Sequence, residues 1–499
     1  MLTDFNLSFG TGGLRGILGE GSDRMNLYTV GRAARGVAGW LGSAGKAVVA
    51  YDTRLMSEEF ARYTARILME NGIEAILFPR PVPTPVLSFA VRKLAADAGI
   101  CITASHNPAE YNGFKVYGAD GGQITPDDAD AITRCILEGA GADAADASRA
   151  PIQASDSVLS DYLDAVERLR LTDIPCDNLR VAYTPLNGAG LECVTEVMRR
   201  IGAEAVVVPE QRAPDGRFPT CPKPNPEEES ALELGSKLCL AQDCDFLLAT
   251  DPDCDRVGVS VRHQGAMRRL TGNEAGLLLL EYICRSLKES GRLPARPVAV
   301  KTIVTSPSAR EICDDYGVEL RDVLTGFKYI GEQIGLLERD GEAERFIFGF
   351  EESCGYLSGI HARDKDGVNA ALLICDMAAA YKREGMTLID GMERLYRRYG
   401  RITTLLKSAE TGPEAVDSLR KNPPSEIAGR PVLKITDYMD GAEGLTADVL
   451  AYEIPEGTVI VRPSGTEPKI KLYYILRGTD DAEQIDADFQ RLHLGRDAP

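Results

Sequence analysis

The sequence is poor in histidine and has no pair of cysteines at the spacing of a zinc site. Its four histidines are dispersed along the 499 residues, and its twelve cysteines include no Cys-x-x-Cys pair. A histidine metal site is therefore not expected, and the cysteines are expected to be reduced core residues rather than a disulfide framework. The first residues carry no basic segment followed by an apolar one, so we expect no signal peptide. These absences favour a cytoplasmic protein.

Basic residues are scarce relative to acidic ones, and long apolar runs are missing. The chain has 56 lysines and arginines against 75 aspartates and glutamates, a formal net charge of -19. Such an acidic surface repels nucleic acid and anionic membranes. The apolar stretch at 275–280 is interrupted at once by Glu281, well short of a membrane span. We expect neither nucleic acid nor a membrane as a partner, and a small anionic substrate would need a local basic cluster.

Three stretches of the sequence repeat one order of elements: an apolar strand, a helix and a second strand. The first strands are expected at 46–51, 179–184 and 298–302. Apolar residues recur at helical spacing in the helices that follow, and a glycine at the end of each helix suits a left-handed cap. Ser308 and Glu311 are expected to form a capping box on the third helix. Because a short return implies parallel strands and a right-handed crossover, the sequence predicts three similar mixed α/β domains in series.

The pattern changes after about residue 400. Apolar strands at 459–461 and 470–476 flank one loop and are typical of paired strands in a smaller α+β domain. Domain boundaries are therefore expected near residues 150, 268 and 400. The predicted domains are 1–150, 151–268, 269–399 and 400–499.

Each of the three α/β units leads on to a further apolar strand that ends in polar residues. The first such strand leads to Ser105, the second to Asp251 and the third to Glu351. Loops at the carboxyl ends of parallel strands are where α/β proteins bind ligands, so we expect functional groups there. The stretch before Asp251 is longer than its counterparts, which predicts an insertion around residues 209–226.

The loop after the first of these strands is Thr103-Ala-Ser-His-Asn-Pro108. Ser105 lies on a turn beside the ring nitrogens of His106, and Pro108 prevents regular hydrogen bonding from continuing. This arrangement presents a hydroxyl at a strand end. Serine, asparagine and proline are also common turn formers, so the six residues alone leave an ordinary turn open.

The loop after the second strand places Asp251, Asp253 and Asp255 at alternate positions. Three carboxylates so spaced can converge on one hard cation and leave room for another oxygen ligand. Arginines stand where an EF-hand needs glycine and glutamate, which excludes that loop. Since burying unpaired carboxylates is costly, a Mg²⁺ site is favoured over a bare acidic turn. Arg256 beside the loop is placed to hold an anion near the metal.

A loop in the carboxyl-terminal domain has the donors that a phosphate dianion requires. Its sequence is Arg462-Pro-Ser-Gly-Thr-Glu-Pro468, and Lys469 and Lys471 follow. The guanidinium, two hydroxyls and glycine-freed backbone suit a phosphate, although a plain β-turn would have a similar composition.

The loop at 349–355 carries acidic groups and a hydroxyl. Glu351 and Ser353 are suited to reading vicinal sugar hydroxyls, although a solvated surface loop has similar residues. Lys365, in the charged turn that follows, is a candidate for proton transfer on the condition that its pKa is lowered.

Three further basic residues complete the set. Arg15 follows a glycine-rich segment that fails the dinucleotide fingerprint, because Arg15 occupies the last glycine position and no strand precedes it. We expect this segment to bring Arg15 onto an anion. Lys115 and Lys328 each follow a Gly-Phe pair.

Together these residues resemble the α-D-phosphohexomutases, the phosphoglucomutase/phosphomannomutase superfamily. The resemblance rests on TASHNP at 103–108, DPDCD at 251–255, GFEES at 349–353 and RPSGTEP at 462–468, in the order of that family. FGTGGLRG and TGFKYIG look most like the phosphoglucomutase-2-like branch.

The resemblance implies four domains around a central active-site cleft, each giving one loop, and an isomerase that interconverts glucose 1-phosphate and glucose 6-phosphate. Ser105 would be a phosphoserine whose phosphate completes the ligands of one Mg²⁺ ion with Asp251, Asp253 and Asp255. It would phosphorylate the free hydroxyl to give a sugar bisphosphate, which turns end for end and returns the other phosphate to Ser105. Trace glucose 1,6-bisphosphate would prime the serine as an activator.

The resemblance also implies roles for the other candidates. The charge on the transferred phosphoryl group would be met by Arg15, Lys115 and Arg256, with His106 as a supporting catalytic residue. The phosphosugar would be bound by Arg256, Lys328, Glu351, Ser353, Arg462, Ser464, Gly465, Thr466 and Lys471. Phosphomannomutase-like members have a histidine where this chain has Tyr356, so proton transfer is expected of Lys365, with His106 close by.

Alternatives stay open at the level of the sequence. A phosphomannomutase or a phosphopentomutase would use the same mechanism, because one glutamate pair does not decide which epimer is preferred. Alternatives of another class are a phosphatase with Asp251 as nucleophile and Asp253 as acid/base, and a non-catalytic phosphosugar-binding protein. The intact serine, the three aspartates and the basic residues favour the mutase.

Overall fold

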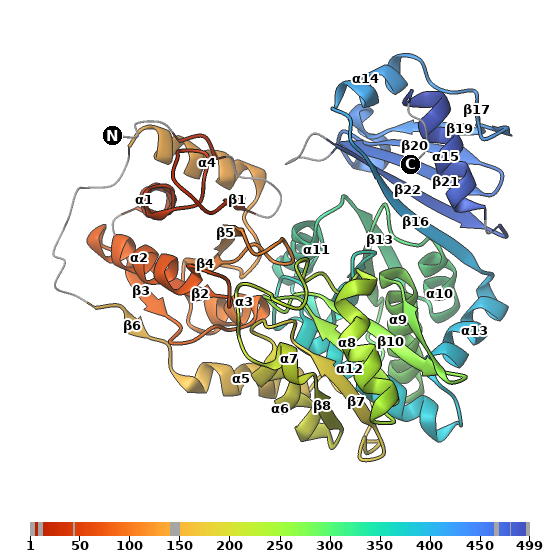
Figure 1. The fold of residues 1–499 in the computed structure, drawn as a ribbon, viewed down its shortest axis with the longest axis horizontal. Coiled ribbons are helices and arrows are strands. Elements are labelled where there is room, and N and C mark those ends of the chain that lie inside the picture. Colours follow the sequence, from red (N-terminus) through yellow and green to blue (C-terminus); the bar gives the residue numbers. More distant parts are fainter. Residues whose placement is uncertain are drawn as a thin grey trace.

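The structure is a computed structural model that describes residues 5–7, 13–42, 45–139, 150–463, 469–479 and 481–495. Within these residues, four sheets of four to six strands, each packed against helices, form four lobes that we call domains I to IV in chain order. In Figure 1, domain I lies at the left and domain IV at the upper right, with domains II and III below and between them. No helix in the described part of the chain is long and apolar enough to cross a membrane.

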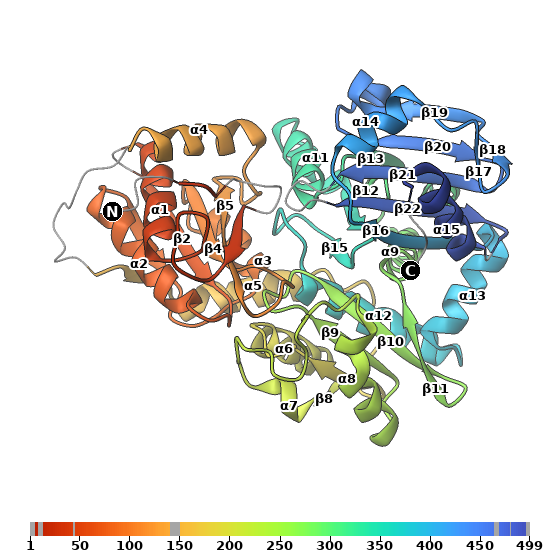
Figure 2. The same ribbon diagram turned by 45° about the horizontal axis from the view of Figure 1, so that its top comes forward.

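Domain I contains a six-stranded sheet in the order β1-β5-β4-β2-β3-β6. Its strands are β1 (Leu14–Ile17), β2 (Lys46–Tyr51), β3 (Glu74–Leu77), β4 (Ala98–Ile102), β5 (Tyr111–Gly118) and β6 (Ile152–Gln153). Its helices are α1 (Leu27–Leu41), α2 (Ser57–Glu70), α3 (Thr84–Lys93) and α4 (Pro126–Leu137). Figure 2 shows α4 lying beside α1 on one side of this sheet. The helix α5 (Asp156–Glu167) then leads to domain II.

Domain II contains a five-stranded sheet in the order β11-β10-β9-β7-β8. Its strands are β7 (Arg180–Thr184), β8 (Glu204–Val207), β9 (Phe246–Thr250), β10 (Val257–His263) and β11 (Ala266–Leu270). Its helices are α6 (Leu191–Ile201), α7 (Pro209–Arg212) and α8 (Glu229–Ala241). The predicted insertion corresponds to α7 and the loop that leads to α8.

Domain III contains a four-stranded sheet in the order β13-β12-β14-β15. Its strands are β12 (Val298–Thr302), β13 (Glu319–Val323), β14 (Phe346–Glu351) and β15 (Gly355–Leu357). Its helices are α9 (Gly272–Glu289), α10 (Ser308–Tyr316), α11 (Phe327–Arg339), the short 3-10 turn η1 (Ala343–Arg345), α12 (Gly367–Arg383) and α13 (Leu388–Tyr399).

Domain IV contains an antiparallel sheet in the order β16-β22-β21-β20-β19. Its strands are β16 (Ile402–Ala409), β19 (Lys434–Asp437), β20 (Leu450–Ile454), β21 (Gly457–Pro463) and β22 (Ile470–Arg477), with a small hairpin of β17 (Glu426–Ile427) and β18 (Arg430–Pro431). Its helices are α14 (Glu414–Lys421), the 3-10 turns η2 (Tyr438–Asp440) and η3 (Ala442–Gly444), and α15 (Ala482–His493). The predicted pairing of the strands on either side of residues 464–468 is confirmed, because β21 and β22 are antiparallel neighbours.

Domains I to III share one arrangement of strands, as the repeat in the sequence predicts. In each domain the first strand of the repeated unit pairs in parallel with the next two, namely β2 with β3 and β4, β7 with β8 and β9, and β12 with β13 and β14. A fourth strand then returns antiparallel to the third one. The loops that carry Ser105 and Asp251 connect the third and fourth strands, and Glu351 is the last residue of β14 before the corresponding loop.

One apolar core runs through domains I, II and III. It includes Val48 and Val86 of domain I, Val181 of domain II and Phe348 of domain III. The helix α12 lies at its centre, and residues 367–381 of that helix are all buried. A helix that is buried all round has an apolar sequence all round, which matches its alanines and leucines. Domain I has a second core of its own, and domain IV has a separate core as well.

The predicted capping box at the start of α10 is wrong. Pro307 is the residue before the helix and already has φ -69° and ψ -17°, so Ser308 is the first helical residue and makes no cap. The carboxylate of Glu311 instead pairs with Arg477 of domain IV at 2.8 Å. The predicted left-handed glycine caps are confirmed at Gly202, with φ 91°, and at Gly317, with φ 70°.

Candidate active site

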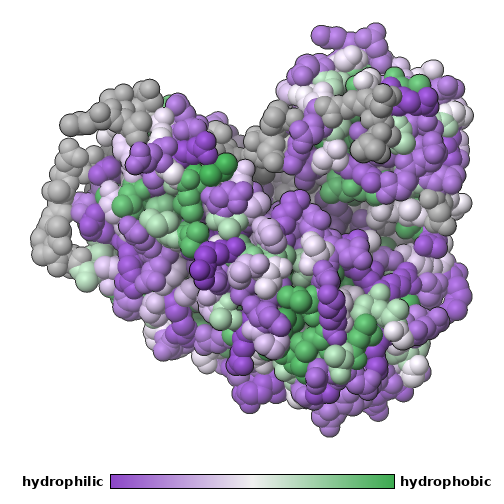
Figure 3. Space-filling model, in the orientation of Figure 1, coloured by the Kyte–Doolittle hydropathy of each residue, from purple (hydrophilic) through white to green (hydrophobic). Residues whose placement is uncertain are grey.

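The three strand-end loops of domains I, II and III meet at one place. The hydroxyl of Ser105 donates a hydrogen bond to Oδ2 of Asp251 at 2.8 Å, which joins domains I and II. The backbone N–H of Val257 donates to the carbonyl oxygen of Cys354 at 3.1 Å, which joins domains II and III. Figure 3 shows that the visible face of the molecule is hollowed between domain I and domain IV. The predicted convergence of these loops is therefore present.

Ser105 lies at the tip of the loop after β4 in a left-handed conformation. Its φ is 54°, which costs energy for a residue other than glycine, and the residue is only 2% exposed. The hydroxyl of Thr103 accepts a hydrogen bond from its backbone N–H at 2.8 Å. The ring nitrogen Nδ1 of His106 lies 3.2 Å from the serine hydroxyl. Burial, and after it the positive charges of Arg256 and Arg15, lower the pKa of His106 well below its usual value, so the ring is neutral.

Asp251, Asp253 and Asp255 are placed to hold a metal ion. They are 0%, 0% and 2% exposed, and one carboxylate oxygen from each lies within 4.8 Å of the others. Oδ1 of Asp253 and Oδ1 of Asp255 are buried without a hydrogen-bond partner. An unpartnered buried carboxylate oxygen is costly unless a cation meets it. The donor set, all oxygen and all anionic, fits a hard divalent cation such as Mg²⁺.

The remaining oxygens of the three carboxylates are held by the protein. Oδ1 of Asp251 accepts hydrogen bonds from the backbone N–H groups of Asp255 and Arg256, at 3.1 and 3.0 Å. Oδ2 of Asp253 accepts from the hydroxyl of Thr84 at 2.9 Å. These contacts fix the carboxylates before any ion binds.

Two lysines compensate the charge of the aspartates. Lys115 of β5 lies 2.7 Å from Oδ2 of Asp253 and 3.2 Å from Oδ2 of Asp255, and Lys365 lies 3.2 Å from the same oxygen of Asp255. Burial by itself would lower the pKa of Lys115, but the two carboxylates outweigh it and raise the pKa. Burial, and next the charges of Asp253 and Asp255, raise the pKa of Asp251 well above its usual value.

Arg15 and Arg256 each carry a buried Nε that lacks a hydrogen-bond partner. Nη1 of Arg15 donates to the side-chain oxygen of Asn107 at 3.1 Å, so this guanidinium lies against the serine loop. Nη1 of Arg256 donates to Glu227 at 2.6 Å and to the carbonyl oxygen of Ser353 at 3.1 Å, and so it spans domains II and III. Both guanidiniums affect the charge state of His106. Unsatisfied donors on two arginines around one serine favour an anion such as phosphate.

The end of β14 supplies the buried Glu351, and the half-buried Glu352 follows it. Oε1 of Glu351, which is 5% exposed, accepts a hydrogen bond from the backbone N–H of Gly326 at 3.0 Å. Burial raises the pKa of Glu351 to about 7. Glu352 accepts from the hydroxyls of Thr302 and Thr305 at 3.3 and 3.4 Å.

Lys365 reaches the aspartates, but its pKa is not lowered, as the predicted role in proton transfer requires. Burial alone would lower its pKa, whereas the carboxylates of Asp255, Asp364 and Glu351 together raise it. The sequence could not supply this result because Asp255 comes from another domain. Lys365 is therefore protonated, and it gives up its proton only to a strongly basic oxygen such as a departing alkoxide. Tyr356 is fully buried and its hydroxyl donates to the carbonyl oxygen of Gly272 at 3.0 Å, away from these groups.

The predicted phosphate-binding loop is described only in part. Ser464, Gly465 and Thr466 lie outside the described residues. Arg462 and Lys471 stand directly opposite each other on β21 and β22, at the base of that loop. Burial lowers the pKa of Lys471. Lys328 lies on α11 with its ammonium 5.2 Å from the centre of the Tyr329 ring, and burial lowers its pKa too.

Two residues that the sequence analysis did not single out also hold the site. Arg54 donates to the carbonyl oxygen of Ser105 at 2.6 Å, and Asp52 accepts from the hydroxyl of Thr103 at 2.6 Å. Both follow directly after β2, so the rule that functional groups follow the carboxyl ends of parallel strands would have found them.

Comparison with known protein families gives a match along nearly all of the chain. Models of the phosphoglucomutase/phosphomannomutase α/β/α domains I, II and III match residues 6–142, 160–265 and 271–399, and the model of the C-terminal domain matches residues 406–492.

Comparison with individual proteins agrees with these matches. A probable phosphomannomutase of Haemophilus influenzae is 37% identical over 486 residues, covering 93% of this chain and 96% of the relative. A phosphoglucomutase of Staphylococcus aureus is 35% identical over 520 residues, covering 96% and 92%. The crystal structure of a putative phosphomannomutase from Thermus thermophilus superimposes with a TM-score of 0.76 at 25% identity, covering 97% of both chains.

Proposed function

Because the chain belongs to the phosphoglucomutase/phosphomannomutase family and is a phosphosugar mutase, we propose that it interconverts glucose 1-phosphate and glucose 6-phosphate through a phosphoserine at Ser105. The observation that carries this proposal is the 2.8 Å hydrogen bond from the Ser105 hydroxyl to Asp251. This contact supports the proposal, because the serine hydroxyl then lies beside a carboxylate cluster that fits a divalent cation.

In this proposal Asp251, Asp253 and Asp255 hold one Mg²⁺ ion, and the two unpartnered carboxylate oxygens support that assignment. A bound Mg²⁺ ion would neutralise charge that develops on the transferred phosphoryl group. Arg15 and Arg256, each with an unpartnered Nε–H group, would meet the same charge, and Lys115 keeps the aspartates in place.

Transfer to the substrate breaks the bond between phosphorus and the Ser105 oxygen and forms one between phosphorus and the sugar oxygen; the sugar hydroxyl loses its proton and the Ser105 oxygen gains one. In the second half, the other phosphoryl group of the sugar bisphosphate returns to Ser105, whose hydroxyl releases its proton, and the departing sugar oxygen takes up a proton. Lys365 holds a proton at Nζ and is our choice for its donor, with neutral His106 supporting the serine. We propose that Glu351 and Ser353 read the sugar hydroxyls, and that Lys328, Arg462, Lys471 and the loop residues Ser464, Gly465 and Thr466 bind the phosphate that does not react.

The deciding experiment incubates the enzyme with glucose 1-phosphate, Mg²⁺ and trace glucose 1,6-bisphosphate and follows glucose 6-phosphate. We expect turnover by the native chain and none above background by Ser105→Ala. Ser290→Ala, which removes a serine hydroxyl bonded to the carbonyl oxygen of Ser286 at the end of α9, is the control and should retain turnover. A Ser105→Ala variant as active as the native chain would overturn the phosphoserine assignment. Mannose and ribose phosphates run in parallel would rank the substrates.

We also infer a reducing compartment, and hence the cytoplasm. All twelve cysteines are free, and eleven of them are buried. Thiols persist in the cytosol, whereas oxidising compartments favour disulfides.

A further inference from the structure

Arg54 holds the backbone of the serine loop through four carbonyl oxygens. Its guanidinium donates to the carbonyls of Ser105 at 2.6 Å, Pro108 at 2.8 Å and Tyr111 at 3.1 Å, and also to that of Asn107. The arginine is only 3% exposed although it carries a full charge. A planar fork of five N–H donors can grip a turn in this way, whereas the single ammonium of a lysine cannot.

Asp52 holds the other side of the same peptide. One of its carboxylate oxygens accepts from the hydroxyl of Thr103 at 2.6 Å, and that hydroxyl in turn accepts from the N–H of Ser105 at 2.8 Å. The same carboxylate oxygen lies 3.4 Å from Nε of Arg54, so the two residues form a buried ion pair. The N–H and the C=O of Ser105 are therefore both fixed by one pair of side chains from the loop after β2. This accounts for how a serine keeps a left-handed backbone.

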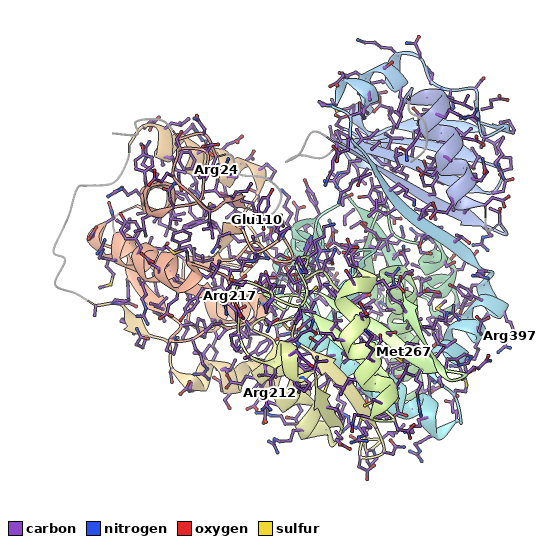
Figure 4. The ribbon with its side chains drawn as sticks, viewed as in Figure 1. Arg24, Glu110, Arg212, Arg217, Met267 and Arg397 are labelled. Atoms are coloured by element: carbon purple, nitrogen blue, oxygen red, sulfur yellow. The ribbon has the colours of Figure 1, made fainter. Side chains whose placement is uncertain are left out.

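The loop between α7 and α8 of domain II braces Arg54 from outside domain I. Gly216 forms a parallel β-bridge with Arg54, and the ring of Phe218 lies 5.0 Å from the guanidinium carbon. The approach is so close that a Cβ on Gly216 would lie 2.3 Å from the backbone nitrogen of Leu55. Figure 4 labels Arg217, between these two residues, where the domain II loop meets the ribbon of domain I.

The bracing loop is tied in turn to the aspartate loop. The side chain of Asn187 donates to the carbonyl oxygen of Ala213 at 2.8 Å. The backbone carbonyl oxygen of Asn187 accepts from the backbone N–H of Asp215 at 3.2 Å. Two residues further on, the N–H of Ala189 donates to the carbonyl oxygen of Pro252 at 2.8 Å. Pro252 stands between Asp251 and Asp253. Hydrogen bonds thus connect the metal-site loop to the serine loop by a second route.

We propose that Arg54, braced by Gly216 and Phe218 of domain II, is a positioning residue that sets the direction of the Ser105 hydroxyl towards the aspartates. The domain II insertion then holds Ser105, the phosphoryl carrier of domain I, in position relative to the metal site of domain II. The inference rests on the proposed function, since it concerns the rate at which Ser105 gives and takes a phosphoryl group.

The test compares Phe218→Leu, Arg54→Lys and two controls. Phe218→Leu keeps an apolar side chain but removes the ring face that braces the guanidinium. Arg54→Lys keeps the charge beside Asp52 but loses the fork. Arg217→Ala alters an exposed neighbour in the same loop, and Phe489→Leu removes the same ring from the buried core of domain IV.

For Phe218→Leu and Arg54→Lys we expect kcat to fall at least about tenfold with KM unchanged, because small displacements of a reacting group are costly. Transfer of the phosphoryl group from glucose 1,6-bisphosphate to Ser105, followed by intact mass in a single turnover, should slow by the same factor. Arg217→Ala and Phe489→Leu should keep the native kcat, although Phe489→Leu lowers the melting temperature as much as Phe218→Leu does.

A kcat for Phe218→Leu within twofold of the native value, or a loss that Phe489→Leu shares, would overturn the inference. A higher KM at unchanged kcat would overturn it too, because it indicates binding rather than positioning. If Arg54→Lys does not fold, Phe218→Leu alone decides. Failure of the proposed function would look different, since the native chain itself would then neither turn over the phosphosugar nor accept a phosphoryl group on Ser105.

Discussion

The hydroxyl of Tyr117 donates a hydrogen bond to Oδ2 of Asp364 at 2.8 Å and so joins β5 of domain I to the segment of domain III that carries Lys365. Asp364 uses its other oxygen to accept from the ammonium of Lys365 at 2.9 Å. Tyr117 lies two residues after Lys115 on the same strand. The hydroxyl of Tyr117 therefore helps to fix the positions of Lys115 and Lys365 relative to each other.

Replacing Tyr117 by phenylalanine should lower both stability and turnover. One buried hydrogen bond to a carboxylate is lost, so the free energy of unfolding should fall by about 1–2 kcal/mol. Lys365 loses part of its orientation, so kcat should fall severalfold. Urea denaturation and the mutase assay measure the two effects. Tyr474→Phe, which removes a buried hydrogen bond to Asp486 at 2.8 Å in domain IV, is the matched control. Equal loss of activity in both variants would argue against a specific role for Tyr117.

Asp253→Ala should abolish metal-dependent turnover in a folded protein. The substitution removes one of three carboxylates that fit the cation, so we expect turnover to fall at least about 100-fold and divalent-ion affinity to drop. Titration calorimetry with Mg²⁺ and circular dichroism check affinity and fold. Asp243→Ala in the same domain removes an exposed carboxylate and should change neither. Unaltered Mg²⁺ affinity in Asp253→Ala would remove this residue from the metal site.

Glu338 should make stability depend on pH. Its carboxylate accepts hydrogen bonds from Arg92 of domain I and from Arg363, and the first of these contacts chiefly lowers its pKa from 4.5 to about 2. A pKa lowered in the folded state gives stability that is complete above the unfolded value and is lost as pH falls towards the folded value. The side chain is 41% exposed, so solvent screening limits the contribution to about 1 kcal/mol.

Glu338→Gln checks this dependence. The difference in unfolding free energy between the native chain and Glu338→Gln should be full at about pH 6 and should shrink as pH is lowered to about pH 3. Urea denaturation at each pH gives the difference. A constant difference over this range would contradict the assignment to the carboxylate charge.

Gly355→Ala should impair the enzyme without unfolding it. A Cβ at this position would lie 2.3 Å from Cδ of Lys365 and 2.8 Å from its Cγ, so the lysine must move. We expect kcat to fall about tenfold or more, measured in the mutase assay. Gly335→Ala in α11 is the control, because a Cβ there would meet nothing within 4 Å. It should raise the free energy of unfolding by about 1 kcal/mol, since alanine is the better helix former, and leave kcat unchanged.

The sequence predicts most of the fold because the strands of the repeated units can be recognised from their apolar runs. Strands such as Phe246–Thr250 are buried along their whole length and are therefore apolar throughout. The residues that follow them are polar, which marks Ser105 and Asp251 as candidates. Their contact joins the strand ends of two different sheets, so it depends on how domains I and II pack. Those candidate residues can be identified from the sequence because the signal, polar residues directly after an apolar strand, lies in one short segment.

Other features depend on contacts that distant residues make. The role of Arg54 follows from its hydrogen bonds to four backbone carbonyl oxygens and from its contact with a loop of domain II. No pattern in the sequence indicates either contact. The charge state of Lys365 depends on Asp255, more than a hundred positions away in the sequence. The cap expected of Ser308 fails because Pro307, which precedes the helix, already has helical dihedral angles, so Ser308 is inside the helix.

The apolar core that runs through domains I, II and III has a consequence for how the molecule melts. Three of the four lobes in Figure 1 contribute residues to it, so melting of one of them removes packing from the other two, although domain I also has a second cluster of its own. Domain IV buries its own apolar residues separately. The number of lobes is thus not the number of cooperative units, and a calorimetric scan should resolve two transitions, the smaller of them belonging to the last hundred or so residues.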